Sequence, residues 1–151
     1  MKTSTQQVII EPAQPADEAA IRALLRQAEL PDEDFAVHLP HFLVARHSGG
    51  IVGVIGLELH GADALLRSLA VAPAWRGDGL GGALVRRLED EARRKSVQHF
   101  YLLTASAEKF FARRWFKTIP RNRVPAAIAA TPEFLGLCPA SAVCMTRAVM
   151  P

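Results

Sequence analysis

The sequence predicts a mixed α/β fold of the α+β kind, in one domain that covers residues 1–151. Short apolar runs alternate with amphipathic helical patterns along the chain, and no linker-like stretch interrupts them. The first half contains a hairpin pattern, which indicates antiparallel strands. A strand, a glycine-rich loop and a long helix pattern follow it. A chain of 151 residues also has the usual length of a single domain.

In the first half, an apolar run predicts a strand over residues 8–12. A helix is predicted after Asp17 and ends near Pro31, because one face of its pattern is apolar: Ile21, Leu24, Leu25 and Ala28. Residues 30–40 read as a loop with one helical turn. The strands that follow are predicted over residues 42–46, 51–59 and 64–72, with a turn at 48–50 and a stop at Pro73.

The second half alternates helices and strands. The pattern predicts, in order, a helix that ends near residue 95, a strand over 99–105, a helix over 106–116, a short strand over 117–120, a short helix over 131–139 and a strand over 141–150. The later strand–helix units after an antiparallel hairpin indicate a mixed sheet.

Composition and charge exclude several classes of protein. The net charge of +3 is too small to argue for nucleic-acid binding, and it suits a small anionic ligand. No run of 18 apolar residues predicts a membrane span, and the first ten residues lack the apolar stretch of a signal peptide. Two cysteines, Cys138 and Cys144, are too few for a disulfide framework, so we expect buried, inert thiols in a cytoplasmic protein.

The loop between the strand at 64–72 and the next helix is rich in glycine, at Gly77, Gly79 and Gly81. Glycine disfavours helix by about 1 kcal/mol relative to alanine, so something there requires bare backbone. The first N–H groups of a helix lack partners and lie at the positive end of its dipole, which suits a pyrophosphate. A dinucleotide-binding fold would place such a loop after the first strand, whereas here it follows a meander, so that alternative is rejected. An ordinary glycine-rich turn remains the other interpretation.

The stretch LAVAPAWRGDGLGGALV resembles the GCN5-related N-acetyltransferase (GNAT) superfamily, whose signature is R/Q-x-x-G-x-G/A. The resemblance extends from Val8 to Met150. It implies the GNAT fold: a mixed, mostly antiparallel sheet of about seven strands with flanking helices and a splayed slot between strands 4 and 5. It also implies that acetyl-CoA binds as cosubstrate, without a metal, at Leu69, Ala70, Val71, Arg76, Gly77, Asp78, Gly79, Leu80, Gly81 and Thr104.

Further segments, among them GLELHG, LLRSLAV and LCPASAVCM, resemble the arsenic-resistance-type N-acetyltransferases. The short bacterial N-acetylglutamate synthases share LCP-x-S-A and the arginine of strand four. Both resemblances imply a small, amino-acid-like acceptor rather than a protein tail. A homodimer is a further expectation, with neither nucleic acid nor membrane as partner.

Acetyl transfer to an amine needs a base that removes the proton of the acceptor. Glu58 is the candidate, because it lies on the third strand between Leu57 and Leu59 and alternation places it on the opposite face from both. A solvated strand glutamate is an equally weighted alternative. His60 is the reserve candidate, although a surface histidine at a turn is the simpler interpretation.

Arginines suggest how the acceptor is held. Arg67 interrupts an apolar strand, where a guanidinium is costly unless it is paired. The carboxylate of an amino-acid substrate would pair with it through two bonds, and the alternative is an internal salt bridge with Glu58. The resemblance adds Arg121 and Ser141 as substrate-binding candidates, which would otherwise be a solvated loop arginine and a serine at the start of a strand.

Two positions depart from the superfamily. Phe111 stands where a tyrosine usually protonates the leaving thiolate, so solvent or Tyr101 would replace that acid. Trp115 stands where a glycine usually ends the helix, and we expect the helix end to differ because tryptophan adopts the left-handed conformation only with strain. These departures keep a non-catalytic acetyl-CoA sensor open beside a small-molecule N-acetyltransferase. A protein acetyltransferase is a third class, which the basic charge disfavours.

Overall fold

The computed structural model describes residues 7–151. The strands are β1 Ile9–Pro12, β2 Phe42–His47, β3 Gly50–His60, β4 Asp63–Val71, β5 His99–Thr104, β6 Lys117–Thr118 and β7 Val143–Ala148. The α-helices are α1 Glu18–Gln27, α2 Leu80–Arg94, α3 Glu108–Ala112 and α4 Ala126–Ala129. Shorter 3₁₀ turns and one π-helical turn at Glu133–Leu137 connect them. The predicted elements are therefore present, although α3 is shorter than predicted and α4 was not foreseen.

The strands form one seven-stranded sheet in the order β1-β2-β3-β4-β5-β7-β6. Strands β4 and β5 are parallel, whereas β1–β2, β2–β3, β5–β7 and β6–β7 are antiparallel. The prediction of a mixed, mostly antiparallel sheet of about seven strands is confirmed. None of the helices in residues 7–151 combines the length and the apolar character that a membrane span requires.

Residue contacts divide the chain into two compact units. Unit 1 contains the chain up to Leu57 together with Ser68–Asp90, and unit 2 contains Glu58–Arg67 together with Glu91–Pro151. The boundaries fall inside β3, β4 and α2, so the two units share these elements. The sequence interpretation of residues 1–151 as a single domain stays a prediction.

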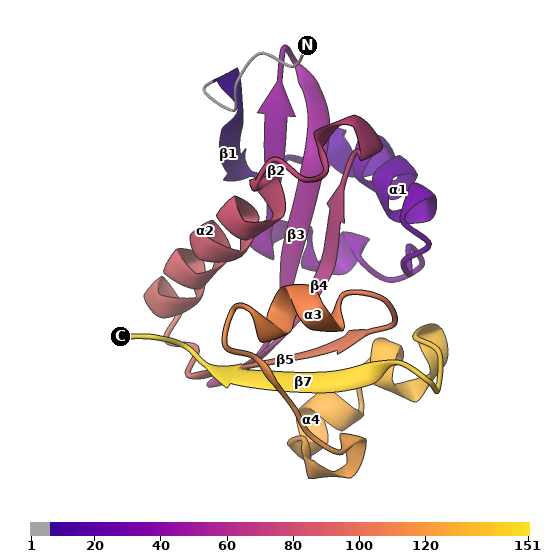
Figure 1. Ribbon diagram of the computed structural model, residues 1–151, viewed down its shortest axis with the longest axis vertical. Coiled ribbons are helices and arrows are strands. Elements are labelled where there is room, and N and C mark those ends of the chain that lie inside the picture. The colour runs from indigo at the N-terminus through magenta and orange to yellow at the C-terminus, as the bar shows by residue number, and fades with distance from the viewer. Residues whose placement is uncertain (1–6) are drawn as a thin grey trace. The chain divides into compact units, whose positions relative to one another are not determined.

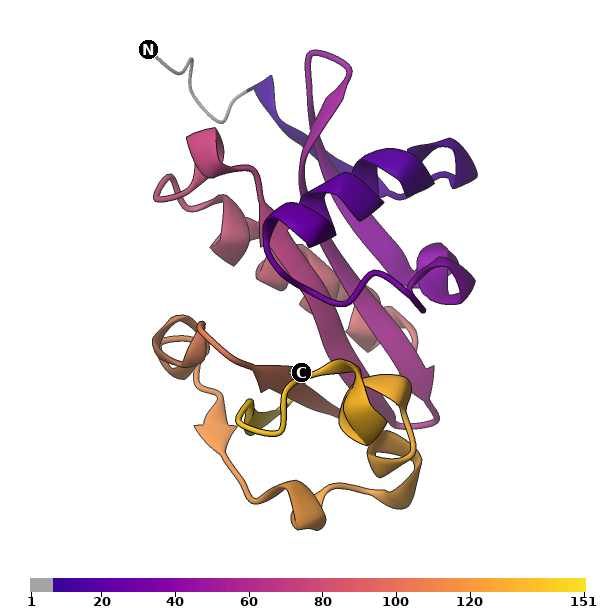
Figure 2. The ribbon, with the colours of Figure 1, turned by 90° about the vertical axis from the view of Figure 1, so that its right-hand side faces the viewer.

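In unit 1, helices cover both faces of the strands, as Figure 2 shows with α1 in front and the first turns of α2 behind. The predicted apolar face of α1 is buried, with Ile21, Leu24 and Leu25 packed in one core cluster with Phe42, Val44 and Val54. The residues that alternate with Val44 and Val54 along their strands point to the other face, toward α2. A Cβ added at Gly53, for example, would lie 3.0 Å from Leu84. Gly56 is required by packing, because a Cβ there would overlap the ring of Phe42, its partner across the strands.

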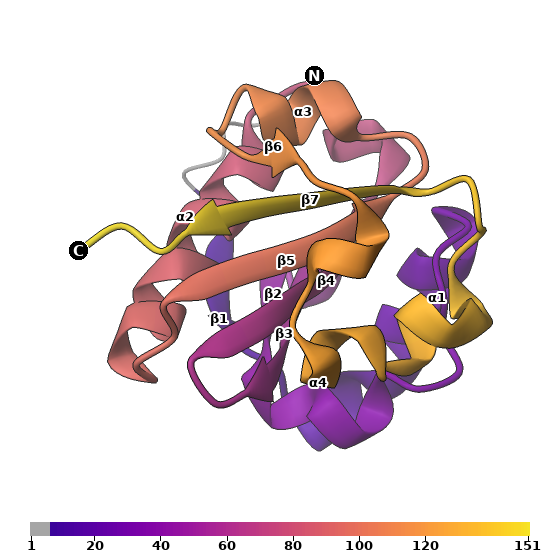
Figure 3. The same ribbon diagram turned by 90° about the horizontal axis from the view of Figure 1, so that it is seen from below.

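In unit 2, β5 and β7 run side by side over their whole length (Figures 1 and 3). The Phe100 ring of β5 stacks on Phe116 at 6.1 Å, and Phe116 meets Phe111 edge-on at 5.4 Å. The guanidinium of Arg147 in β7 lies over both Phe100 and Phe116. These rings form the core on which α3 rests.

The helices α1, α2 and α3 end in the same way, in a Schellman motif. Each has a left-handed residue just past its end, at Glu29 (φ +59°), Ser96 (φ +62°) and Trp115 (φ +73°). After α1 the N–H of Leu30 donates to the carbonyl of Leu25, and after α2 that of Val97 donates to Ala92, which is the defining bond of the motif. None of the three left-handed positions is a glycine.

The prediction that Trp115 would change the end of α3 was wrong. Trp115 N–H donates to Ala112 and Phe116 N–H donates to Phe111, both at the spacing of the Schellman motif. The Phe111–Phe116 ring contact supplies the apolar pair that accompanies this motif. These bonds and this contact hold the tryptophan in the left-handed conformation, at a strain of about 1–2 kcal/mol.

Candidate functional site

The glycine loop leads from β4 to α2 within unit 1. After Val71 a 3₁₀ turn at Pro73–Trp75 turns the chain, and α2 begins at Leu80. Gly77 and Gly79 have φ values of +85° and +84°, and a Cβ added at either residue would meet nothing within 4 Å. Glycine is therefore required by the backbone conformation and not by crowding, and the backbone of the loop faces open space at the N-terminus of a 15-residue helix.

The ends of the loop are fixed by packing. Trp75 is buried and its ring lies 4.8 Å from that of His47, while Leu80 is 3% exposed. The exposed Arg76 folds back, and its Nε donates to the carbonyl oxygen of Val71 at 2.9 Å. Asp78 and Gly81 lie in the loop and in the first turn of α2, as the sequence predicts. The loop thus presents a fixed row of backbone groups between two anchored ends.

Strand β4 changes conformation in its middle. Ser68 is buried and has a φ of +62°, and among residues 7–151 it is the one residue inside a strand with a positive φ. A left-handed residue inside a strand is a mark of a β-bulge. Leu69 and Ala70 follow it, and Ala70 is 4% exposed. Ser68 thus marks a local irregularity in β4, while the splayed slot between strands 4 and 5 stays a prediction.

Thr104 ends β5, in unit 2. Its Oγ1 accepts the N–H of Ala107 at 2.8 Å, at the point where α3 begins. The hydroxyl oxygen therefore already serves the fold as a cap for that turn. Its contact with the cosubstrate stays a prediction.

Unit 2 contains a buried ion cluster, which we define as His60, Glu58, Arg67 and Glu133. The Nη1 of Arg67 lies 3.1 Å from Oε1 of Glu58, and its Nη2 lies 3.3 Å from Oε2 of Glu133. The Nε2 of His60 lies 2.9 Å from the other oxygen of Glu58. Glu58 and His60 belong to β3, Arg67 to β4 and Glu133 to the π-helical turn. The four side chains form one continuous chain of polar contacts.

The charged side chains of this cluster are almost completely buried, which is costly unless each charge has a partner. The side chains of Arg67, Glu58 and Glu133 are 0%, 3% and 5% exposed. Buried charges are tolerated only when they are paired and hydrogen-bonded. The alternative that the sequence left open for Arg67, an ion pair with Glu58, is therefore present, with Glu133 as a second carboxylate. Its role in binding a substrate carboxylate stays a prediction.

Cys138 lies next to the ion cluster. Burial, followed by the nearby carboxylate of Glu133, raises the pKa of the Cys138 thiol to about 12. Burial also raises the pKa of the Cys144 thiol, which is 2% exposed. Both thiols are free and protonated at neutral pH, in agreement with the prediction of inert cysteines. Sequence reasoning missed Glu133 and the Glu133–Cys138 contact because no local pattern relates residue 133 to strands β3 and β4.

The other two predicted substrate residues lie in loops of unit 2. The Nη2 of Arg121 donates to the carbonyl oxygens of Pro139 and Ala142, at 2.6 and 3.2 Å, so it ties two segments together. Its Nε is buried without a hydrogen-bond partner within residues 7–151. Ser141 is exposed in the turn before β7. The roles of Arg121 and Ser141 in binding the substrate stay predictions.

Phe111 is a core residue, 4% exposed, with Phe110 and Phe116 against its ring at 5.0 and 5.4 Å. It therefore offers no proton where the superfamily has a tyrosine. Tyr101 lies in β5, where burial raises the pKa of its hydroxyl and the charge of Asp63 raises it further. Tyr101 is consequently a weaker acid than a free tyrosine.

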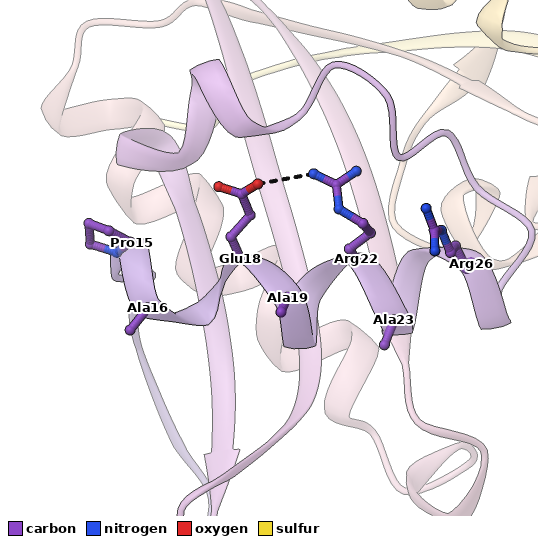
Figure 4. A pocket seen from close by; sticks show the side chains of 7 residues that line it. All are labelled: Pro15, Ala16, Glu18, Ala19, Arg22, Ala23 and Arg26. Atoms are coloured by element: carbon purple, nitrogen blue, oxygen red, sulfur yellow. Dashed lines mark hydrogen bonds and ion pairs between the residues drawn. The ribbon is translucent and has the colours of Figure 1, made fainter.

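A shallow hollow of about 550 Å³ runs along the outer face of α1 in unit 1 (Figure 4). Small and charged side chains line it: Pro15, Ala16, Glu18, Ala19, Arg22, Ala23 and Arg26. Glu18 and Arg22 form an ion pair at 3.0 Å along the helix, and Arg26 pairs with Asp32 at 2.6 Å. It contains none of the predicted site residues.

An acetyltransferase (GNAT) domain model matches residues 38–118. The amino-acid acetyltransferase of Mycobacterium tuberculosis is 38% identical over 91 residues, which cover 58% of this chain and 52% of that protein. The chain thus spans about half the length of this curated relative.

Two solved structures are similar over nearly the whole chain. N-acetylglutamate synthase from Neisseria gonorrhoeae, complexed with coenzyme A and N-acetyl-glutamate, has a TM-score of 0.83 at 24% identity, over 95% of this chain and 35% of that one. The Rv2747 protein from Mycobacterium tuberculosis, in complex with CoA, has a TM-score of 0.80 at 26% identity, over 94% and 99% of the two chains.

Proposed function

Because this chain belongs to the acetyltransferase (GNAT) domain family, we propose that it transfers the acetyl group of acetyl-CoA to the amine of a small, amino-acid-like acceptor. The observation that carries this proposal is the loop at Arg76–Gly81, in which two left-handed glycines expose backbone at the start of α2. The amino-acid acetyltransferase and the CoA-bound proteins among the similar chains support both halves of the proposal.

The cosubstrate pyrophosphate binds the backbone N–H groups of Arg76 to Gly81. The helix dipole and the unpaired N–H groups of the first turn of α2 favour an anion there. Leu69, Ala70 and Val71 supply backbone groups to the pantetheine arm, in the manner of an added strand. The carbonyl of Val71 accepts the Arg76 side chain, so we expect that side chain to move when the arm binds. Thr104 completes the set of proposed cosubstrate contacts.

The reaction forms a C–N bond and breaks a C–S bond. The neutral amine attacks the thioester carbonyl, a backbone N–H of β4 stabilises the oxyanion, and the thiolate of CoA leaves. Glu58 accepts the proton that the amine loses, either directly or through water. The Arg67 guanidinium, 3.1 Å from Oε1, compensates the negative charge of the Glu58 carboxylate. Solvent protonates the thiolate, because Phe111 carries no proton to donate.

The proposed acceptor is an α-amino acid or a close analogue. Its carboxylate would bind Arg67, with help from Arg121 or Ser141. Arg67 already contacts Glu58 and Glu133. A substrate carboxylate must therefore either displace one of these two carboxylates from Arg67 or bind Arg67 beside them. An N-acetylglutamate synthase-like activity is the nearest alternative. A role in arsenic resistance, a cytoplasmic location and a homodimer stay predictions from the sequence.

A second candidate function is supported by one observation. Phe111 is packed into the core in place of the acid, so a domain that binds acetyl-CoA without turning it over would show the same loop. Turnover distinguishes this sensor from the enzyme. The protein is mixed with acetyl-CoA and a panel of amino acids, and thiol release is measured. Release above the rate without acceptor supports the enzyme, and binding without release supports the sensor.

The loop is tested with Gly81→Val, which adds bulk where the pyrophosphate is proposed to bind. Calorimetry should show at least a tenfold loss of CoA affinity in a protein that keeps its melting temperature. Gly77→Val is the less suitable variant, because a β-branched residue at φ +85° strains the backbone whether or not CoA binds. An unchanged affinity in folded Gly81→Val protein would remove the loop from the proposed site.

A further inference from the structure

His60 is the one member of the buried ion cluster with substantial solvent exposure. Its side chain is 26% exposed, whereas those of Glu58, Arg67 and Glu133 are 5% exposed or less. Its Nε2 lies 2.9 Å from Oε2 of Glu58. The imidazole therefore gives the buried carboxylate a path to water.

A buried base must lose its proton again before the next turnover. Glu58 is bounded on one oxygen by Arg67, which keeps its own protons at any pH that a protein survives. The proton that Glu58 gains cannot leave in that direction. The other oxygen contacts Nε2 of His60, and an imidazole ring has two nitrogens through which it can accept a proton and release one.

We propose that His60 is a proton relay, which carries the proton of the acceptor amine from Glu58 to solvent. This inference rests on the proposed acetyl transfer and on Glu58 as its base. Glu58 takes the proton from the amine nitrogen and passes it to Nε2 of His60. The resulting imidazolium loses the proton on Nδ1 to water, so that one proton enters and one leaves. The imidazole donates to ionised Glu58 as the Nε2–H tautomer and accepts the proton as the Nδ1–H tautomer, so each cycle includes one tautomer exchange through solvent and ends in the starting form.

The two ring nitrogens fit these roles. Nε2 contacts the carboxylate of Glu58, and the 26% exposure of the side chain gives the ring access to water. Since His60 touches the reacting groups only through Glu58, it is a positioning and relay residue rather than the base itself. A purely structural role would instead require only the Nε2 contact, and a side-chain amide could replace that contact.

The test therefore uses His60→Gln, whose amide can still donate to Glu58 but cannot carry a proton through. We expect kcat to fall about 10- to 100-fold, because positioned proton transfer contributes about 10²–10⁴-fold and solvent replaces part of it. Added imidazole should restore most of the rate. Glu58→Gln should lose about 10- to 1,000-fold and should not respond to imidazole, since the base itself is missing.

A matched control comes from the same unit. His99 in β5 lies 3.9 Å from Asp63 and is half-exposed, and it belongs to no proposed site. His99→Gln should keep the wild-type rate and show no effect of imidazole. Melting curves establish that each variant is folded, and His60→Asn replaces His60→Gln if the latter is not.

These turnover measurements distinguish a failure of the His60 relay from a failure of the proposed acetyl transfer. Wild-type turnover together with an unaffected His60→Gln rate would overturn the relay alone. A slow His60 variant that imidazole does not restore would also overturn it, in favour of a structural role. A wild-type protein that releases no thiol with any amine would overturn the proposed function and the relay together.

Discussion

The glycine loop of unit 1 and the buried ion cluster of unit 2 are built by opposite means. The loop offers backbone: Gly77 and Gly79 have no side chains, and the space around their Cα atoms is open. The cluster offers side chains: Arg67 holds the carboxylates of Glu58 and Glu133 in a setting from which water is nearly excluded. One site depends on a local conformation, and the other depends on charge balance.

This difference determines how each site responds to change. A backbone site tolerates the loss of a side chain but not a change of φ, because its donors are fixed by the chain itself. A buried charge site tolerates neither the loss nor the shift of one member, since each charge compensates another. Substitutions in the cluster should therefore have larger effects on folding than substitutions in the loop.

The largest expected effect follows Arg67→Met, which keeps the length of the side chain and removes its charge. Two buried carboxylates then lose their common partner, and the free energy of unfolding should fall by about 3–5 kcal/mol. Urea denaturation followed by circular dichroism measures this loss. Adding Glu133→Gln to Arg67→Met should recover part of it, because one of the uncompensated charges is removed.

Arg67→Lys separates the structural role from substrate binding. A lysine keeps the charge but cannot reach two carboxylates with a planar fork. We expect lower stability, as the contacts with Glu58 and Glu133 require. A variant with unchanged melting temperature and a sharply raised KM for the amino acid would show instead that Arg67 mainly serves the substrate.

The same contrast explains what the sequence could predict. The loop is a run of six neighbouring residues from Arg76 to Gly81, so its place between a strand and α2 followed from local pattern. The Glu58–Arg67 pair could be named as an alternative because the two residues lie on consecutive predicted strands. Glu133 could not, because it reaches the cluster from a turn more than sixty residues along the chain.

Helix ends show the limit of local rules in a second way. Glycine is the usual sign of a left-handed helix end, and the ends of α1, α2 and α3 carry glutamate, serine and tryptophan instead. The bonds that define these ends join backbone groups, which any residue supplies. The sequence therefore predicted where α1, α2 and α3 lie, and their C-terminal geometry had to come from the structure.

A smaller effect is expected for Gly79→Ala in the loop. Its φ of +84° is unfavourable for alanine by about 1 kcal/mol, and the methyl group meets no neighbour within 4 Å. The free energy of unfolding should fall by about that amount, several times less than for Arg67→Met. Urea denaturation of the two variants side by side checks the ratio. A loss as large as that of Arg67→Met would mean that the loop is packed rather than open.

The smallest effect, and one of opposite sign, is expected for Trp115→Gly at the end of α3. The backbone there has a φ of +73°, close to that of the loop glycines, but a bulky residue occupies it. Glycine removes the strain of the left-handed conformation, and little apolar burial is lost because Trp115 is 76% exposed. The variant should therefore gain about 1 kcal/mol, seen as a higher urea midpoint. Trp115→Ala is the control, since it removes the same ring without the preference of glycine for positive φ. A glycine variant no more stable than the alanine variant would show that the Schellman bonds and the Phe111–Phe116 contact hold this turn without measurable strain.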